Sequence, residues 1–196
     1  IWMYHKSVLS CSRKRGAKMK IRKVLISLLT CFSFSCLVHS KIVSADELVT
    51  DGKAAILIEA ETGEILYEKN PHEQLAPASM TKMMSMYLIL ESIHNGALQW
   101  DEVIRVSENA ASYGGSQIYL KPGEKMIVRD LFKSIAIASA NDSVTALAER
   151  VAGSEEAFVE LMNQKAKELG MNNTVFKNPT GLTAAGHVTT PYDMSI

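Results

Sequence analysis

The sequence predicts a mixed α+β domain, in which a β-hairpin precedes a cluster of helices. Two short apolar runs, residues 54–59 and 64–68, flank Glu61-Thr62-Gly63, as expected for two strands joined by a tight turn. Longer segments with apolar residues at helical spacing follow from residue 79 onward. We expect the sheet to be incomplete within this chain.

The helices are expected in four segments with recognisable ends. The predicted segments are 79–93, 128–138, 141–151 and 154–169. Asn95-Gly96 and Gly170 follow the first and the last of them and are typical of helix ends. Ser154, followed by Glu155 and Glu156, is typical of a helix start, because serine caps the first turn and the helix dipole favours acids there.

The remaining segments are predicted to be irregular. Residues 100–127 are mixed in character, with turns at Gly114-Gly115 and Pro122-Gly123. Residues 174–176 are a candidate short strand, and the chain from there to Asp193 is predicted to be a loop.

Charge divides the chain into two unlike parts. Residues 1–45 contain nine Lys and Arg and no Asp or Glu, whereas residues 46–196 contain the other 12 basic residues and all 21 acidic ones. The second part therefore has a formal charge of −9, which argues against nucleic acid as a partner.

The basic part has the layout of a secretory signal peptide, predicted over residues 19–45. A basic start precedes an apolar run of about 15 residues, shorter than the roughly 20 that a spanning anchor, the alternative, would need. Val43-Ser44-Ala45 offers small residues for cleavage before Asp46. Because Met19 directly precedes the basic start, residues 1–18 are interpreted as an upstream extension. All three cysteines, Cys11, Cys31 and Cys36, precede residue 46, so residues 46–196 can form no disulfide and no thiolate metal site.

Ser79-Met80-Thr81-Lys82 is the first candidate catalytic motif. Residues three apart share a helix face, so the Lys82 amine is expected within reach of the Ser79 hydroxyl. Burial of Lys82 among Met80, Met83, Met84 and Met86 is expected to lower its pKa, which would let it accept the serine proton. The alternative is that Ser79 only caps the helix and Lys82 is solvated.

Ser139-Ala140-Asn141 is the second candidate motif, in the expected break between two helices. We expect Ser139 to relay a proton toward the leaving group, and Asn141 to bind the substrate amide and to contact Lys82. The alternative is that Asn141 caps the next helix. Ser107-Glu108-Asn109 has the same spacing but is predicted to be an ordinary helix start.

These motifs resemble those of penicillin-binding proteins and serine β-lactamases. The surrounding residues are similar to the low-molecular-mass D-alanyl-D-alanine carboxypeptidases of peptidase family S11, from about residue 47 to the end. The likeness rests on the hairpin and on Leu75-Ala76-Pro77-Ala78 before the first motif, Ser139-Ala140-Asn141-Asp142-Ser143, Asn178-Pro179-Thr180-Gly181-Leu182, and Gly186-His187-Val188-Thr189-Thr190.

The resemblance implies the β-lactamase/penicillin-binding-protein-like transpeptidase fold and a serine D,D-carboxypeptidase. Ser79 would form an acyl-enzyme with peptidoglycan stem peptides ending in D-Ala-D-Ala and release the terminal D-alanine. It also implies reaction with β-lactam antibiotics, no cofactor or metal, and an exported protein at the outer face of the cell membrane or in the cell wall. Many relatives carry a C-terminal membrane anchor beyond their catalytic domain.

One departure separates this chain from the family pattern. The third motif, Lys-Thr-Gly or Lys-Ser-Gly on a strand, is absent, and Lys121-Pro122-Gly123 is a turn in the wrong chain order. We therefore expect residues 46–196 to be the N-terminal part of the catalytic domain, truncated before the third-motif strand, poorly folded and poorly active in isolation.

Three other functions use related machinery. A β-lactamase would need a glutamate to activate the deacylating water, and residues 178–187 contain none. A D,D-endopeptidase would use the same machinery. The presence of Ser79 and Lys82 argues against a non-catalytic envelope protein that binds muropeptide or β-lactam, whereas a full-length protein without the third motif would argue for it. The histidines show no triad or zinc spacing, and His187 is predicted to be structural.

Overall fold

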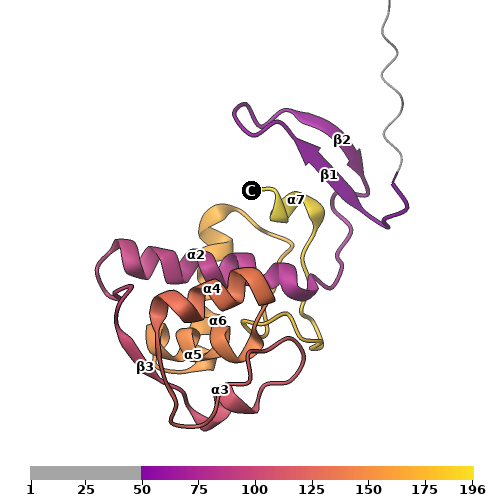
Figure 1. The fold of residues 1–196 in the computed structure, drawn as a ribbon. Helices are drawn as coiled ribbons and strands as arrows, with labels where there is room; N and C mark the ends of the chain where they lie inside the picture. Colours follow the sequence, from indigo (N-terminus) through magenta and orange to yellow (C-terminus); the bar gives the residue numbers. More distant parts are fainter. Residues whose placement is uncertain (1–49) are drawn as a thin grey trace, which may run out of the picture. The chain divides into compact units, whose positions relative to one another are not determined.

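The computed structural model describes residues 50–196 (Figure 1). The predicted upstream extension, residues 1–18, and the predicted signal peptide, residues 19–45, lie outside the described residues.

Four helices form the main body of the described chain: α2 (Thr81–His94), α4 (Val128–Ala138), α5 (Asn141–Ala152) and α6 (Glu155–Leu169). These bounds confirm the four predicted helical segments to within two residues at each end. Helix α5 packs against α2, α4 and α6 and therefore lies at the centre of the cluster (Figure 1).

The central position of α5 explains its burial. Eight consecutive residues, 141–148, are buried, although four of them are Asn, Asp, Ser and Thr. The core around this helix is built from apolar residues of all four helices, including Ile89, Leu131, Leu147 and Phe158, each fully buried. Polar groups inside such a core need partners, so the polar start of α5 identifies a place where other segments must supply them.

The strands form two separate antiparallel pairs. The predicted hairpin is confirmed as β1 (Ala55–Ile58) and β2 (Ile65–Lys69), with a register irregularity between Leu57 and Ile58. The second pair, β3 (Val103–Arg105) and β4 (Lys125–Ile127), was not predicted, because strands of three residues are too short to show a period-2 pattern. The mixed α+β class is confirmed.

Short elements account for the other differences from the sequence prediction. Residues 174–176 do not form a strand: only one isolated bridge, Val175 to Val188, is present there. Helix α7 (Pro191–Met194) lies in the segment predicted to be a loop, with the Thr190 side chain accepting a hydrogen bond from the Asp193 amide. Helix α3 (Glu108–Ser112) is capped by Ser107, as predicted for an ordinary helix start.

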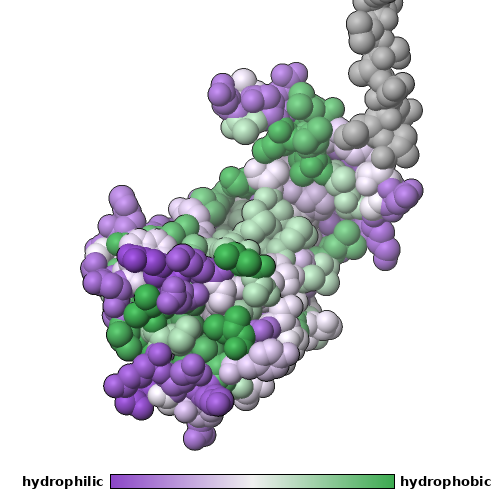
Figure 2. All heavy atoms as spheres, in the orientation of Figure 1, coloured by the Kyte–Doolittle hydropathy of each residue, from purple (hydrophilic) through white to green (hydrophobic). Residues whose placement is uncertain are grey.

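The hairpin presents apolar side chains to the surface. Leu57, Ile65 and Leu66 are each about half exposed, and Figure 2 shows this hydrophobic cluster on the hairpin.

Of the helices in the described part of the chain, none has both the length and the apolar character that a membrane crossing requires.

Candidate active site

Ser79 lies in a single 3-10 turn, η1 (Ala78–Met80), which leads directly into α2. The side chain of Ser79 is exposed, and neither η1 nor α2 has a side-chain cap at its start. The alternative that Ser79 is only a helix cap is therefore wrong. Ala78 has a φ of +47°, a left-handed conformation that is costly for a residue with a side chain. The turn thus presents the serine hydroxyl to solvent on a strained piece of backbone.

Lys82 is buried one turn along, with 3% of its surface exposed. Its Nζ lies 3.4 Å from Ser79 Oγ and donates a 2.7 Å hydrogen bond to the Thr180 carbonyl oxygen. Burial lowers the pKa of the Lys82 amine to about 8, because the charged form loses its hydration. The predicted burial and lowered pKa are confirmed, and the alternative of a solvated lysine is wrong.

The predicted surroundings of Lys82 need correction. Met80 and Met83 are each 53% exposed, so they are not part of a buried environment around the amine. A neighbouring residue in sequence occupies a different helix face, so the methionines beside Lys82 could not all cover it. The Thr180 carbonyl, which accepts a hydrogen bond from the buried amine, is 98 residues away in sequence.

Residues 178–182 form a tight loop that packs on the start of α2. The side-chain oxygen of Asn178 accepts hydrogen bonds from the backbone amides of Thr180 and Gly181 at 3.2 and 2.7 Å. Ser85 of α2 donates to the Pro179 carbonyl at 2.7 Å, beside the bond from Lys82 to Thr180. Two consecutive carbonyls of the loop therefore bind two side chains of one helix face.

Gly181 allows the closest approach in this region. A Cβ at this position would lie 1.8 Å from the Ala78 carbonyl oxygen, so no other residue fits without movement of the backbone. Gly181 also has a φ of +85°. The sequence signal was the Asn178-Pro179-Thr180-Gly181 string, which marks a turn but does not show what the turn contacts.

Ser139 and Asn141 lie at the predicted break between α4 and α5. Ser139 is half-buried in the left-handed conformation, with φ +55° and ψ 35°, and closes α4. Asn141 is the first residue of α5, and its side-chain amide donates to the Gly114 carbonyl at 2.7 Å. The alternative that Asn141 caps α5 is wrong, since residue 140 occupies the cap position without a side-chain bond.

The expected contact between Asn141 and Lys82 is not present. Among the described residues, the hydrogen bonds of Lys82 go to Ser79 and Thr180. Asn141 is instead held by Gly114 and Ser116, because its side-chain amide donates to the Gly114 carbonyl and its backbone amide donates to the Ser116 carbonyl at 2.7 Å.

Asp142 is a structural residue of the site that sequence reasoning missed. Its carboxylate is fully buried and accepts hydrogen bonds from the backbone amides of Ile118, at 3.1 Å, and Leu120, at 3.0 Å. Tyr119 between them has a φ of +62°. An acidic residue directly after Asn141, at the start of the predicted apolar helix 141–151, was the available signal, but its burial and its backbone partners are not visible in the sequence.

The surroundings of the two motifs come together where Gly115 approaches the loop 178–182. A Cβ at Gly115 would lie 2.9 Å from the Asn141 side-chain nitrogen and 3.8 Å from the Leu182 side chain. Leu182 follows Gly181, which contacts Ala78 next to Ser79. The loop 178–182 therefore touches both the residue before Ser79 and the surroundings of Asn141.

This arrangement can support nucleophilic chemistry without histidine or metal. An exposed hydroxyl lies beside a buried amine whose pKa is lowered to about 8, so the amine is able to exchange a proton with the hydroxyl. Over residues 50–196, no three or more His, Cys, Asp or Glu side chains are grouped to hold a metal ion.

Comparison with known proteins gives a single family. The family model described as D-alanyl-D-alanine carboxypeptidase, peptidase family S11, matches residues 40–196. The D-alanyl-D-alanine carboxypeptidase DacF of Bacillus subtilis is 57% identical over 150 residues, which are 76% of this chain and 39% of that protein. The chain spans about two-fifths of the length of the curated relatives that it matches.

Solved structures agree with this result. The D-alanyl-D-alanine carboxypeptidase DacD from Francisella tularensis is 46% identical, with a TM-score of 0.73, over 75% of this chain and 36% of that one. Penicillin-Binding Protein D2 from Listeria monocytogenes, in its ampicillin-bound form, is 33% identical with a TM-score of 0.67, over 75% of this chain and 60% of that one. The expected penicillin-binding-protein-like fold is confirmed, and the chain belongs to the D-alanyl-D-alanine carboxypeptidase family, peptidase family S11.

Proposed function

We propose that the full-length protein containing this chain is a serine D-Ala-D-Ala carboxypeptidase of the bacterial cell wall. Its substrate would be the peptidoglycan stem peptide, from which it removes the terminal D-alanine. The observation that carries this proposal is the buried Lys82 amine beside the exposed Ser79 hydroxyl, in a chain of this family.

In the proposed reaction, Ser79 is the nucleophile and Lys82 the general base. Neutral Lys82 accepts the Ser79 proton while Oγ attacks the carbonyl carbon of the penultimate D-alanine. The peptide C–N bond then breaks, Ser139 relays the proton from Lys82 to the departing D-alanine amine, and an ester remains on Ser79. Water hydrolyses this ester and restores the serine. Asn141 would donate to the substrate amide, for which its side chain would have to share or exchange its bond to Gly114.

The family supports a second partner, β-lactam antibiotics, and a location. A β-lactam presents a strained amide in place of the D-Ala-D-Ala bond, and the Listeria relative was solved with ampicillin and with cefotaxime bound. We propose that this protein is likewise acylated by β-lactams, that it works on the outer face of the membrane, and that the basic leader, residues 19–45, exports it. Attachment through a C-terminal anchor is a further part of the proposal.

Acylation by a fluorescent penicillin tests the proposal in the full-length protein. Labelling should vanish with Ser79→Ala and fall by at least about a hundredfold with Lys82→Ala, as for loss of a nucleophile or its base. Ser107→Ala and Asn109→Ala are matched controls for Ser139→Ala and Asn141→Ala, because they share the Ser-x-Asn spacing in an ordinary helix start. Labelling that survives Ser79→Ala would refute the assignment.

Release of D-alanine from a pentapeptide separates the enzyme from a binding protein. We expect free D-alanine at a rate that depends on Ser79, and little cleavage of cross-linked dimers. Labelling by penicillin without D-alanine release would favour the non-catalytic alternative, and preferential cleavage of cross-links would favour a D,D-endopeptidase.

A further inference from the structure

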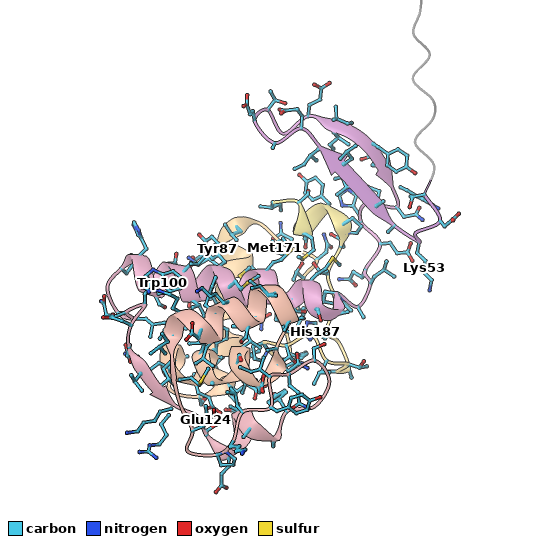
Figure 3. All side chains as sticks on the ribbon, in the orientation of Figure 1. Lys53, Tyr87, Trp100, Glu124, Met171 and His187 are labelled. Carbon is cyan, nitrogen blue, oxygen red and sulfur yellow. The ribbon has the colours of Figure 1, made fainter. Side chains whose placement is uncertain are left out.

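His187 is a buried histidine that the proposed reaction does not use. Its side chain is 4% exposed, and Nε2 lies 2.9 Å from the Thr81 hydroxyl, which is itself fully buried. Its other ring nitrogen, Nδ1, is buried without a hydrogen-bond partner among the described residues. The ring packs edge-on against Phe176, with centroids 5.9 Å apart. Figure 3 shows His187 below the beginning of α2.

The residue that His187 contacts lies inside the first motif. Thr81 follows the turn that presents Ser79 and directly precedes Lys82. Its hydroxyl is also close to Gly181, since a Cβ at that glycine would lie 3.0 Å away. Thr81 is thus enclosed by the same segment, residues 178–187, that binds Lys82 through Thr180.

A purely space-filling role would not require a histidine at this position. An apolar side chain of similar volume would avoid the cost of burying an unpaired ring nitrogen. The imidazole supplies one interaction in return, the hydrogen bond to Thr81. Burial, and then the nearby Lys177, lower the pKa of His187, so the ring is neutral near pH 7 and can bond to a hydroxyl without introducing a charge beside Lys82.

We propose that His187 is a positioning residue for acylation, which through its bond to Thr81 holds the Ser79 turn and Lys82 at the distance that proton transfer requires. The inference rests on the proposed function. His187 acts through Thr81, since among the described residues its ring bonds to Thr81 and not to Ser79.

The test compares three variants of the full-length protein: His187→Leu, His187→Gln and Thr81→Val. Stopped-flow labelling with a fluorescent penicillin separates the dissociation constant of the first complex from the acylation rate constant. His187→Leu and Thr81→Val should each lower the rate constant about tenfold with the dissociation constant little changed, because small displacements of reacting groups act on the chemical step. His187→Gln keeps a side-chain amide able to bond to Thr81 and should recover most of the rate.

A double variant shows whether the two residues act as one unit. His187→Leu with Thr81→Val should be within about twofold of the slower single variant, since both remove the same bond. Thr174→Val is the stability control, because Thr174 is buried just before the segment 178–187 and bonds to Thr189 and Asp193 rather than to α2. It should lower the melting temperature without lowering the acylation rate of the folded protein.

Several results would overturn the inference while leaving the proposed function intact. These are a normal acylation rate in Thr81→Val or folded His187→Leu, a loss in His187→Gln as large as in His187→Leu, or additive losses in the double variant. If His187→Leu does not fold, Thr81→Val and His187→Gln decide the question. Absence of labelling in the folded wild type would instead refute the proposed function itself.

Discussion

The two candidate motifs are built in different ways, although both contain a serine next to strained backbone. Ser79, in the turn η1, and Lys82, in α2, are three residues apart, but their surroundings come from residues 98 to 106 positions away. The side chains of Asn141 and Asp142 in the second motif bond to residues only 22 to 27 positions earlier in the chain. The first motif therefore depends on the docking of a distant segment, whereas the second depends on a loop that closes locally.

This difference has a consequence for stability. Bringing distant segments together costs more chain entropy than closing a short loop, so the contacts around Lys82 must be close and numerous to persist. The contacts meet this requirement, because two carbonyls and a glycine of the loop 178–182 lie within contact distance of the start of α2. A substitution in the loop 178–182 should therefore lower the acylation of Ser79 more than any substitution near Asn141.

Gly181→Ala should have the largest effect. The added Cβ would overlap the Ala78 carbonyl, so the loop must move away from Ser79 and Lys82. We expect the free energy of unfolding to fall by about 3 kcal/mol or more, as for severe overpacking, and acylation by fluorescent penicillin to fall at least about a hundredfold.

Gly186→Ala is the matched control for this change. Its φ of +76° is similar, but its nearest neighbour would be the end of the Lys177 side chain at 3.5 Å. It should cost about 1 kcal/mol from the backbone conformation alone and leave acylation nearly unchanged. Equal effects of the two substitutions on acylation would show that the loop does not position the first motif.

The pH dependence of acylation should be the next largest effect. Only neutral Lys82 accepts a proton, and its pKa is about 8, so the rate should rise about tenfold per pH unit below that value and level off above it. Rates of penicillin labelling between pH 6 and 10 measure this directly. Exposed Lys133→Ala should leave the midpoint unchanged, and a rate independent of pH would contradict the assignment of Lys82 as base.

Asp142→Asn should have a smaller effect, confined to the second motif. The amides of Ile118 and Leu120 donate to one carboxylate oxygen and the amide of Ser143 donates to the other, so the single acceptor oxygen of Asn leaves the donors on one side without an acceptor. We expect about 2 kcal/mol lower free energy of unfolding and faster hydrogen exchange at the amides that lose their acceptor.

Asp130→Asn is the control for the buried acid. Asp130 is exposed in the first turn of α4, where its removal should cost about 0.5 kcal/mol. If Asp142→Asn slowed acylation as strongly as Gly181→Ala, the distinction between the two regions would fail.

The smallest expected effect separates the strain at Ser139 from its hydroxyl. Ser139→Gly and Ser139→Ala both remove the hydroxyl, but only glycine adopts a φ of +55° without cost. Ser139→Gly should be more stable than Ser139→Ala by about 1 kcal/mol in thermal unfolding, with equal loss of acylation in both. Equal stabilities would show that this conformation is not strained.

Much of the fold and of the candidate site was predictable, because the signals are local. Helical spacing and stop signals located all four main helices, and the turn at Glu61-Thr62-Gly63 located the hairpin. The three-residue separation of Ser79 and Lys82 predicted their proximity, since helix geometry is a property of neighbouring residues. The strands β3 and β4 could not be found in this way. Their pairing joins residues about 20 positions apart, and each strand has only 3 residues, too few to show an alternating pattern.

By itself, the sequence determined which residues are candidates for chemistry and which family the chain resembles. Only the tertiary structure decided what surrounds them: the Thr180 carbonyl on Lys82, Gly181 against Ala78, His187 on Thr81 and the amides of the 118–120 loop on Asp142. These contacts join backbone groups or residues far apart in the chain. A backbone carbonyl is the same in every residue, so no amino-acid pattern identifies which one a buried amine will meet.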